Sequence, residues 1–582
     1  MIKYLQLSCN VTILYTTMNP RSTFLFLICG TLFCISVTAQ PVKNRRPNIV
    51  FILADDLGYM DLNVYAKKIT GVSAKEQFYE TPEIDRLARE GIAFSSAYVN
   101  PLCSPTRASI ITGRYASKLG FMTATGGNAS TFYNRGEKPL KGFNEQDALW
   151  GDKIDIQQAW INGYTNIALP SGQPQDYGVN EITIAEALKG YNSGFIGKWH
   201  LGGHGSEGYQ PHDQGFDEIA FFDGGSSPYL NWRALWDRKE KYYPKMRQAQ
   251  LIQGKSGMET GKTYLTDDLT EQAVNYIDRQ ASSNDKKPFL LYFCEFAVHG
   301  PLQAPQGMVD YFDKKSTKGW NGDNNSTYAA MIKSLDNSVG RIMTKLKETG
   351  LDDNTVVVFM SDNGGISFDA KSPQGLTTSN APLKGSKAMM YEGGIRVPLI
   401  IWQKGQIKGG QWSDVPVHCA DIFPTFLQFA HQGTDDYNLD GQSIKPLLND
   451  PKNIKKQYTR NTFYWHYPLN VAPENPDDNL PLTPHSAIRK GDYKLIFDWY
   501  GRLKLYNIKK DMSEKNNLAF KKPELTRELF ANLIGWLEKN VDSKYLPTLN
   551  KLYNPTKESR NIPFVDLYGS FKQGIDIVKI AN

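Results

Sequence analysis

The chain carries the apolar stretch NIVFILA at residues 48–54, and Asp55-Asp56 follows it directly. A nearly continuous apolar run of this length is typical of a parallel strand that is buried on both faces. Similar runs alternate along the chain with helical patterns, which predicts an α/β fold with a mostly parallel sheet. The other strand-like runs lie at 193–197, 289–293 and 355–360, and the helical patterns lie at 81–91, 183–189, 267–279 and 328–348.

Polar residues follow four of these predicted strands, close to the point where each strand ends. Ligands bind at the carboxyl edge of the strands in open α/β sheets, so we expect the four groups to meet at one location. Taken singly, each group would more often be a solvated loop charge. The groups are Asp55-Asp56, Lys198-Trp199-His200, His299-Gly300-Pro301 and Asp362-Asn363.

Four of these side chains offer only hard oxygen ligands, and three of the four are anionic. This set suits Ca²⁺ or Mg²⁺, and no His or Cys pair has the spacing of a zinc site. A buried cluster of three carboxylates without a cation would be very costly, so a metal is the simplest account. The alternative is that these residues cap helices or turns after their strands. The four are Asp55, Asp56, Asp362 and Asn363.

A second stretch carries residues suited to binding or catalysis: it reads PLCSPTRAS at residues 101–109. Ser104 is a good N-cap and a proline follows it, so we expect a short helix that begins just after Cys103. Cys103 would then lie at a helix N-terminus, where backbone N–H groups and the helix dipole favour a bound anion. Arg107 lies one turn along on the same face. The alternative interpretation is a buried free cysteine with Arg107 as a surface charge.

The start of the chain has the pattern of an export signal. Arg21 precedes an apolar run at 24–37, and small residues before Gln40 offer a cleavage site. The run is short for a bilayer span, so we expect an exported, periplasmic or secreted protein with no stable membrane span. Met18 is an alternative start of translation.

After cleavage few cysteines remain, which argues against a disulfide framework. They are Cys103, Cys294 and Cys419.

The 582 residues carry a formal net charge of +6 and no dense run of Lys or Arg. Nucleic-acid binding therefore has no support.

The chain is longer than a domain with a single hydrophobic core usually is, so we expect a large domain with a smaller one. We divide the chain into a signal peptide at 1–39, an α/β domain at 40–455 and a C-terminal α+β domain at 456–582. The last is expected to hold strands at 462–465, 486–489, 492–497 and 503–506 and a helix at 523–540.

Three stretches resemble the signatures of the type I sulfatases, which depend on formylglycine. They are CSPTR at 103–107, GKWHLG at 197–202 and YEGGIRVP at 391–398, and they occur in the family's order. The resemblance covers essentially the whole mature chain and extends to bacterial polysaccharide sulfatases. It implies an alkaline-phosphatase-like α/β domain and a smaller C-terminal domain with an antiparallel sheet.

The resemblance also implies a modified residue and a metal. Cys103 would be oxidised to formylglycine by a formylglycine-generating enzyme or an anaerobic maturase. The hydrated aldehyde and the four oxygen-bearing side chains would bind one Ca²⁺, with Mg²⁺ the less expected ion. One diol oxygen would attack sulfur and release the alcohol, and loss of the second hydroxyl proton would then expel sulfate. His200 matches the family's base for that second step.

Four further roles follow from the same resemblance. His299 and Lys387 match the residues that contact the sulfate and assist the leaving oxygen. Lys198 and Arg107 match those that hold and polarise the diol. Lys387 is preferred over Lys384 because of its distance from the YEGG stretch. Cations fixed in a dry site stabilise the charge that develops during transfer far better than exposed ones.

These observations predict an exported, calcium-dependent sulfatase that acts on a sulfated polysaccharide or its oligosaccharides, for instance algal ulvan or carrageenan. Two long stretches, at 121–177 and 222–257, are expected to wall a carbohydrate-sized pocket, although core packing suits their aromatic residues equally well. The family's polar sulfate contact near 225–227 has no firm match. The aromatic residues are Trp150, Trp160, Tyr229, Trp232 and Trp236, and 465–467 are expected at the pocket mouth.

Two other functions stay open at this point. A phosphoester or phosphonate hydrolase shares the fold, the formylglycine and the metal, but phosphatases on this fold commonly recruit further metal ligands, and we find none in the sequence. A catalytically silent glycan-binding protein would result if Cys103 were never oxidised. The intact set of His200, Lys198, Arg107 and the metal carboxylates argues against that second alternative, because a pure binder would not need a nucleophile and a base together.

Overall fold

The apolar run at 48–54 forms β1 (Asn48–Ala54), which is buried along its whole length and pairs in parallel with a strand on each side. The computed structural model describes residues 45–124, 160–161, 178–179, 181–201, 211–222, 224–230, 232, 264–367, 376–468, 471–474, 476, 481–482, 484–547 and 564–582. The expected signal peptide at 1–39 lies outside these residues. Within them, no helix combines the length and apolarity that a membrane crossing needs.

β1 belongs to the main sheet, whose strand order is β10-β2-β9-β8-β1-β7-β5-β6, with β11 also paired to β2. Only β9 runs antiparallel to its neighbours β2 and β8, so the described sheet is mostly parallel, as the sequence predicts. The other strands are β2 (Ile92–Tyr98), β5 (Asn192–Lys198), β6 (Glu218–Phe222), β7 (Phe289–Cys294), β8 (Thr355–Ser361), β9 (Arg396–Gln403), β10 (Gln411–Ser413) and β11 (Val417–His418).

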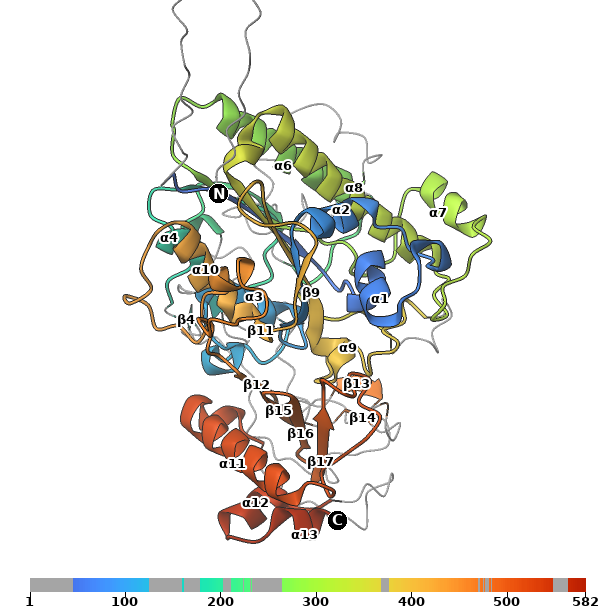
Figure 1. Cartoon of the computed structure of the whole chain (residues 1–582), viewed down its shortest axis with the longest axis vertical. Coiled ribbons are helices and arrows are strands. Elements are labelled where there is room, and N and C mark those ends of the chain that lie inside the picture. Colours follow the sequence, from blue (N-terminus) through green and yellow to red (C-terminus); the bar gives the residue numbers. More distant parts are fainter. Residues whose placement is uncertain are drawn as a thin grey trace, which may run out of the picture. The chain divides into compact units, whose positions relative to one another are not determined.

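Alternate residues of β1 contribute to two hydrophobic cores, one on each face of the main sheet. Val50 and Ile52 belong to the core covered by α1, α2, α6, α7 and α8, whereas Phe51 and Leu53 belong to the core with α3, α4 and α10. Figure 1 shows these two helix groups on either side of the sheet. Burial on both faces is why the strands read as continuous apolar runs. The helices are α1 (Asn63–Thr70), α2 (Pro82–Glu90), α3 (Cys103–Thr112), α4 (Ile184–Ala187), α6 (Leu265–Ser282), α7 (Gln306–Asp313), α8 (Ser326–Glu348), α9 (Glu392–Ile395) and α10 (Ile422–Phe429).

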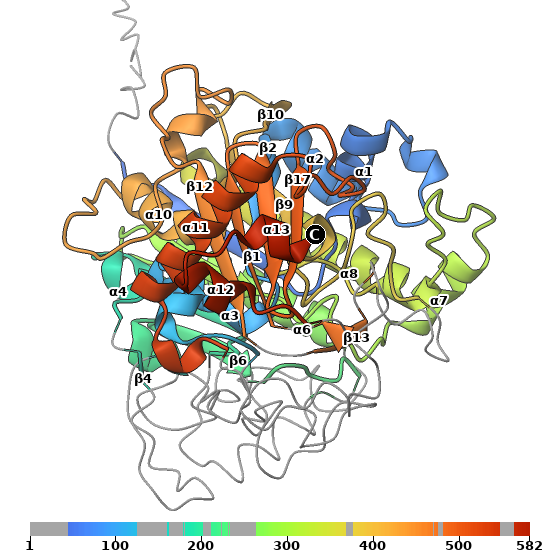
Figure 2. The ribbon, with the colours of Figure 1, turned by 90° about the horizontal axis from the view of Figure 1, so that it is seen from below.

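A four-stranded antiparallel sheet in the order β12-β15-β16-β17 follows, and α11 packs on it. Its core is continuous with Tyr98, Leu102 and Tyr391 of the preceding α/β part. Figure 2 shows α11 and α13 in front of the main sheet when the molecule is seen from below. The elements are β12 (Thr462–Tyr467), β15 (His485–Lys490), β16 (Tyr493–Asp498), β17 (Arg502–Asn507), α11 (Pro523–Asn540), α12 (Leu567–Lys572) and α13 (Ile577–Ala581); two short pairs are β3 (Trp160–Ile161) with β4 (Gly178–Val179), and β13 (Val471–Glu474) with β14 (Pro481–Leu482).

The predicted elements agree closely with this architecture. The runs at 193–197, 289–293 and 355–360 are β5, β7 and β8, and the helix predicted at 523–540 has the bounds of α11. A mostly parallel sheet flanked by helices, with a smaller antiparallel sheet, confirms the expected fold class. The domain boundary near residue 455 stays a prediction.

Candidate active site

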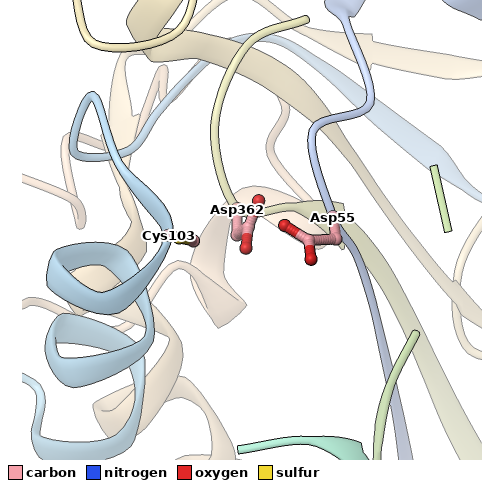
Figure 3. Close-up of side chains that lie close together, drawn as sticks. All are labelled: Asp55, Cys103 and Asp362. Carbon is pink, nitrogen blue, oxygen red and sulfur yellow. The ribbon is translucent and has the colours of Figure 1, made fainter. Parts of the chain in front are cut away.

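The carboxyl ends of neighbouring strands bring the predicted site residues to one place. Asp55-Asp56 follow β1, Asp362-Asn363 follow β8, and Lys198 is the last residue of β5. Since β1 lies between β7 and β8, and β5 lies beside β7, these strand ends share one edge of the sheet. Figure 3 shows Asp55 and Asp362 near Cys103 at the start of α3.

Cys103 is the first residue of α3, and Leu102 is its N-cap. The prediction that Ser104 caps this helix is therefore wrong. The Ser104 hydroxyl donates instead to the His200 carbonyl at 2.8 Å, which ties the helix to the end of β5. That contact sets Sγ of Cys103 3.3 Å from Nδ1 of His200. Burial raises the pKa of the Cys103 thiol, so the unmodified side chain is a poor nucleophile.

Arg107 is buried and faces the site, so the interpretation of Arg107 as a surface charge is wrong. Its Nε and Nη2 donate to Oδ2 of Asp362 at 3.1 and 2.8 Å, and its Nη1 donates to the Lys198 carbonyl at 2.8 Å. Nζ of Lys198 donates in turn to Oδ2 of Asp55 at 2.5 Å. The three cation–carboxylate contacts are fully desolvated, which makes their geometry strongly interdependent.

Asp56 is the meeting point of three other predicted site residues. Its Oδ1 accepts from Nζ of Lys387 at 2.6 Å and from the Asn363 amide at 2.7 Å, and its Oδ2 lies 3.5 Å from Nε2 of His299. Burial, the largest single effect, would raise the pKa of the Asp56 carboxyl, but Lys387, His299 and Lys198 together outweigh it and hold that pKa below its ordinary value. Lys384, the rejected candidate, has its Nζ over the Tyr391 ring instead.

His299 presents one ring nitrogen to the site. Its Nδ1 lies 2.6 Å from the Gly300 carbonyl, and because a carbonyl only accepts, Nδ1 carries the proton. Burial lowers the pKa of the imidazole to about 4. The Tyr229 hydroxyl holds this loop by donating to the His299 carbonyl at 2.8 Å. The sequence did not indicate that role for Tyr229.

Three buried oxygens of the metal-ligand candidates have no hydrogen-bond partner among the described residues: Oδ1 of Asp55, Oδ2 of Asp56 and Oδ1 of Asn363. Ligand atoms of Asp55, Cys103 and Asp362 also lie within 4.8 Å of one another. Burial, followed by repulsion from Asp362, raises the pKa of the Asp55 carboxyl to about 8. A cation bound between these oxygens would relieve both effects. The residues present therefore fit a hard divalent ion such as Ca²⁺.

Some predicted pocket residues lie elsewhere. Tyr229 and Trp232 are buried, and the Trp232 indole donates to Asp268 at 2.8 Å, so they pack in the core rather than wall a pocket. Trp465 and His466 are also buried, so the expectation that they reach the pocket mouth is wrong; the Trp465 indole donates to the Val99 carbonyl. Tyr467, expected beside them, is buried as well. Trp150, Trp236 and the side chain of Trp160 lie outside the described residues.

One expected contact region does reach the site. A Cβ placed on Gly225 would lie 3.1 Å from Nε2 of His200, so the 225–227 segment, where a polar sulfate contact was sought, borders the far side of that imidazole. Ser226 and Ser227 are both candidates for that sulfate contact by position. Ser226 is exposed and Ser227 is buried. No sequence signal distinguishes the two.

Two family models and several known proteins match this chain. A family model described as Sulfatase matches residues 47–142 and 159–432, and one described as N-sulphoglucosamine sulphohydrolase, C-terminal, matches 385–541. The chain is 31% identical over 416 residues to N-acetylgalactosamine-6-sulfatase of Canis lupus familiaris, covering 69% of this chain and 66% of that protein's length. It is 28% identical to a sulfatase of Formosa agariphila, covering 88% of this chain and 92% of the relative.

A solved structure is also similar over nearly its whole length. The crystal structure of Ps i-CgsB in complex with k-i-k-neocarrahexaose shares 28% identity and a TM-score of 0.61, covering 87% of this chain and 95% of that one. The Sulfatase model alone spans more than half of the present chain, including every residue of the cluster around Asp56 and Cys103. The chain belongs to the sulfatase family of sulfuric ester hydrolases.

Proposed function

We propose that this protein hydrolyses sulfate esters of a sulfated polysaccharide or its oligosaccharides, with a formylglycine made from Cys103 as nucleophile and one Ca²⁺ as cofactor. The observation that carries the proposal is the position of Cys103. It begins α3, lies 3.3 Å from the His200 imidazole, and stands beside carboxylates with oxygens that have no hydrogen-bond partner among the described residues. An anionic sulfate is favoured at such a helix N-terminus.

The metal would be held by Asp55, Asp56, Asp362, Asn363 and the modified residue 103. When bound, Ca²⁺ would supply positive charge that offsets the buried carboxylates and polarises the oxygens of sulfate and nucleophile. Support for this assignment comes from the three unpartnered oxygens of Asp55, Asp56 and Asn363, which are hard ligands.

The protein's own side chains would handle charge and protons. Lys198, Lys387 and Arg107 are buried cations whose positions are fixed by carboxylates, so they need no reorganisation to stabilise charge on sulfate oxygens. His200 faces residue 103 through Nδ1, which suits it to accept a proton from that residue. His299 lies on the other side of Asp56, where the protonated form of its imidazole would donate from Nε2 to the leaving oxygen.

A glycan is the favoured substrate class on two grounds. One relative is named for N-acetylgalactosamine 6-sulfate, and one similar structure holds a neocarrahexaose. We extend the proposal to an exported protein, periplasmic or secreted, that is matured by a formylglycine-generating enzyme or an anaerobic maturase.

Release of inorganic sulfate tests the proposal. The full chain, produced together with a maturation enzyme, would be incubated with carrageenan, ulvan and a sulfated glycosaminoglycan, and free sulfate would be measured. We expect release from at least one glycan, loss of release in Cys103→Ala, and retention in Cys419→Ala, a matched change of another buried cysteine. Turnover of phosphate or phosphonate esters alone, or glycan binding without hydrolysis, would overturn the proposal in favour of its two alternatives.

A further inference from the structure

A buried cluster of charges joins the C-terminal sheet to the segment that carries Lys387. Lys494, in β16, is fully buried, and its Nζ contacts Oε1 of Glu392 at 2.7 Å and Oε1 of Glu514 at 2.8 Å. Glu392 is the first residue of α9. Its Oε2 accepts from Nε of Arg396 at 2.6 Å and from the Tyr98 hydroxyl at 2.8 Å.

Glu514 fixes the backbone at the start of α9. Its Oε2 accepts from the backbone N–H of Glu392 at 2.7 Å, so the carboxylate satisfies a helix N–H that has no partner within the helix. Nζ of Lys494 also donates to the Met390 carbonyl at 2.9 Å. Two residues of the C-terminal part, one cation and one anion, therefore hold both the main chain and the side chain at the start of α9.

From α9 the contacts lead directly to Lys387. The Gly393 N–H donates to the Lys384 carbonyl at 2.7 Å and closes the turn in which Lys387 lies. A Cβ on Gly393 would overlap the Gly385 carbonyl, and one on Gly394 would overlap the Met389 carbonyl. The EGG sequence therefore serves close backbone packing of this turn against α9.

The same turn is tied to the two chemical centres of the site. The Lys387 N–H donates to the Gly365 carbonyl at 3.2 Å, just after the Asp362-Asn363 pair, and the next N–H donates to the Pro101 carbonyl at 2.8 Å, two residues before Cys103. The Lys387 side chain then reaches Asp56. A shift of α9 would therefore move Lys387 relative to both Cys103 and the metal ligands.

We infer that Lys494 and Glu514 are positioning residues for Lys387, so that the C-terminal sheet completes the active site through α9. The inference rests on the proposed function for its kinetic consequence, because it assumes that Lys387 contacts the sulfate. The contacts themselves do not depend on that assumption. Loss of the charge of Lys494 or Glu514 would leave the remaining charges of the cluster buried without a counter-charge. It would also loosen the start of α9.

A double-mutant cycle tests the kinetic part. Glu514→Gln keeps an acceptor for the Glu392 N–H but removes the charge, and we expect it to lower kcat roughly ten- to hundred-fold, because small misplacements of a catalytic group cost that much. In a Lys387→Ala background the same change should lower kcat roughly two-fold or less, because the group being positioned is gone. An equal fall in both backgrounds would overturn the inference. Lys494→Met should behave like Glu514→Gln if it folds.

Hydrogen exchange supplies a readout that needs no activity. Glu514→Gln should speed amide exchange across residues 384–395, whereas Arg460→Gln, which breaks a buried contact with Asp421 elsewhere, should leave that segment unchanged. Unchanged exchange at 384–395 in Glu514→Gln would refute the positioning role even in an enzyme with full activity. If the wild-type protein releases no sulfate while Glu514→Gln still speeds exchange at 384–395, only the proposed function is refuted.

Discussion

Sγ of Cys103 lies 3.3 Å from Nδ1 of His200, although the two residues are 97 positions apart, one at the start of α3 and the other just after β5. The Ser104 hydroxyl maintains this pairing by donating to the His200 carbonyl. His200 has a positive φ of 54°, a conformation that a non-glycine residue keeps only where its surroundings enforce it. The backbone is thus arranged to aim this imidazole at residue 103.

Replacing His200 with Gln should lower kcat about a hundred-fold or more, because a positioned base contributes that order of rate. Sulfate release at saturating glycan measures the effect. His212→Gln is the matched control, since His212 is a partly exposed residue beside Asp213 and has no place in the site. Comparable activity of the two variants would show that His200 is not the base.

Arg107→Lys should lower activity at least about ten-fold, although the substitution keeps the positive charge. A lysine cannot reproduce the fork that contacts Asp362 twice and the Lys198 carbonyl once. The control is Arg114→Lys, which alters an arginine two residues beyond the end of α3 that pairs with Glu181. Wild-type kcat/KM in Arg107→Lys would contradict the account of this contact.

Added Ca²⁺ should raise the Tm of metal-depleted protein by a few degrees, because an ion that binds only the folded state stabilises it. Asn363→Ala, which removes one of the unpartnered oxygens, should reduce that shift. Asp323→Asn, a change of a buried acid outside the cluster, should preserve it. A larger shift with Zn²⁺ than with Ca²⁺ would contradict a site made of hard oxygen ligands.

Glu295 should make the protein less stable as pH rises. The side chain is fully buried, its Oε1 accepts from Ser338, and burial raises the pKa of the carboxyl from 4.5 to about 8. A raised folded-state pKa means that stability is greatest below the unfolded value and falls as pH rises toward 8.

Glu295→Gln should therefore leave Tm nearly unchanged at pH 4.5 and raise it by a few degrees at pH 8. Thermal unfolding across this range measures the difference between the two proteins. Glu348→Gln, a change on the exposed end of α8, should show no such trend. A stability difference that does not depend on pH would rule out titration of Glu295 as its cause.

Sequence reasoning located the sheet and the site because both depend on local patterns. Apolar runs such as 48–54 are continuous since both faces of the sheet are covered, and the polar residues stand out where each run ends. The N-cap of α3 was misplaced because a tertiary contact, from Ser104 to His200, overrode the local preference of serine.

Other features could not be read from local patterns. Tyr229 and Trp465 are aromatic residues whose ring chemistry suits a sugar pocket or a core equally well, and only the fold decides between them. The role of Lys494 was missed, although one signal was present. It is a lysine within the strand sequence YKLIFD, where a buried cation requires a partner from elsewhere in the chain.

The central claim is that residue 103 acts as an oxidised cysteine, and mass spectrometry of the tryptic peptide 90–107 tests it most directly. Protein from the native host, or produced with a maturation enzyme, should carry this peptide about 18 Da lighter than the thiol form, because conversion to the aldehyde is a covalent modification. The lighter peptide should increase in proportion to sulfate release. A preparation that releases sulfate while the peptide keeps only the thiol mass would contradict the account.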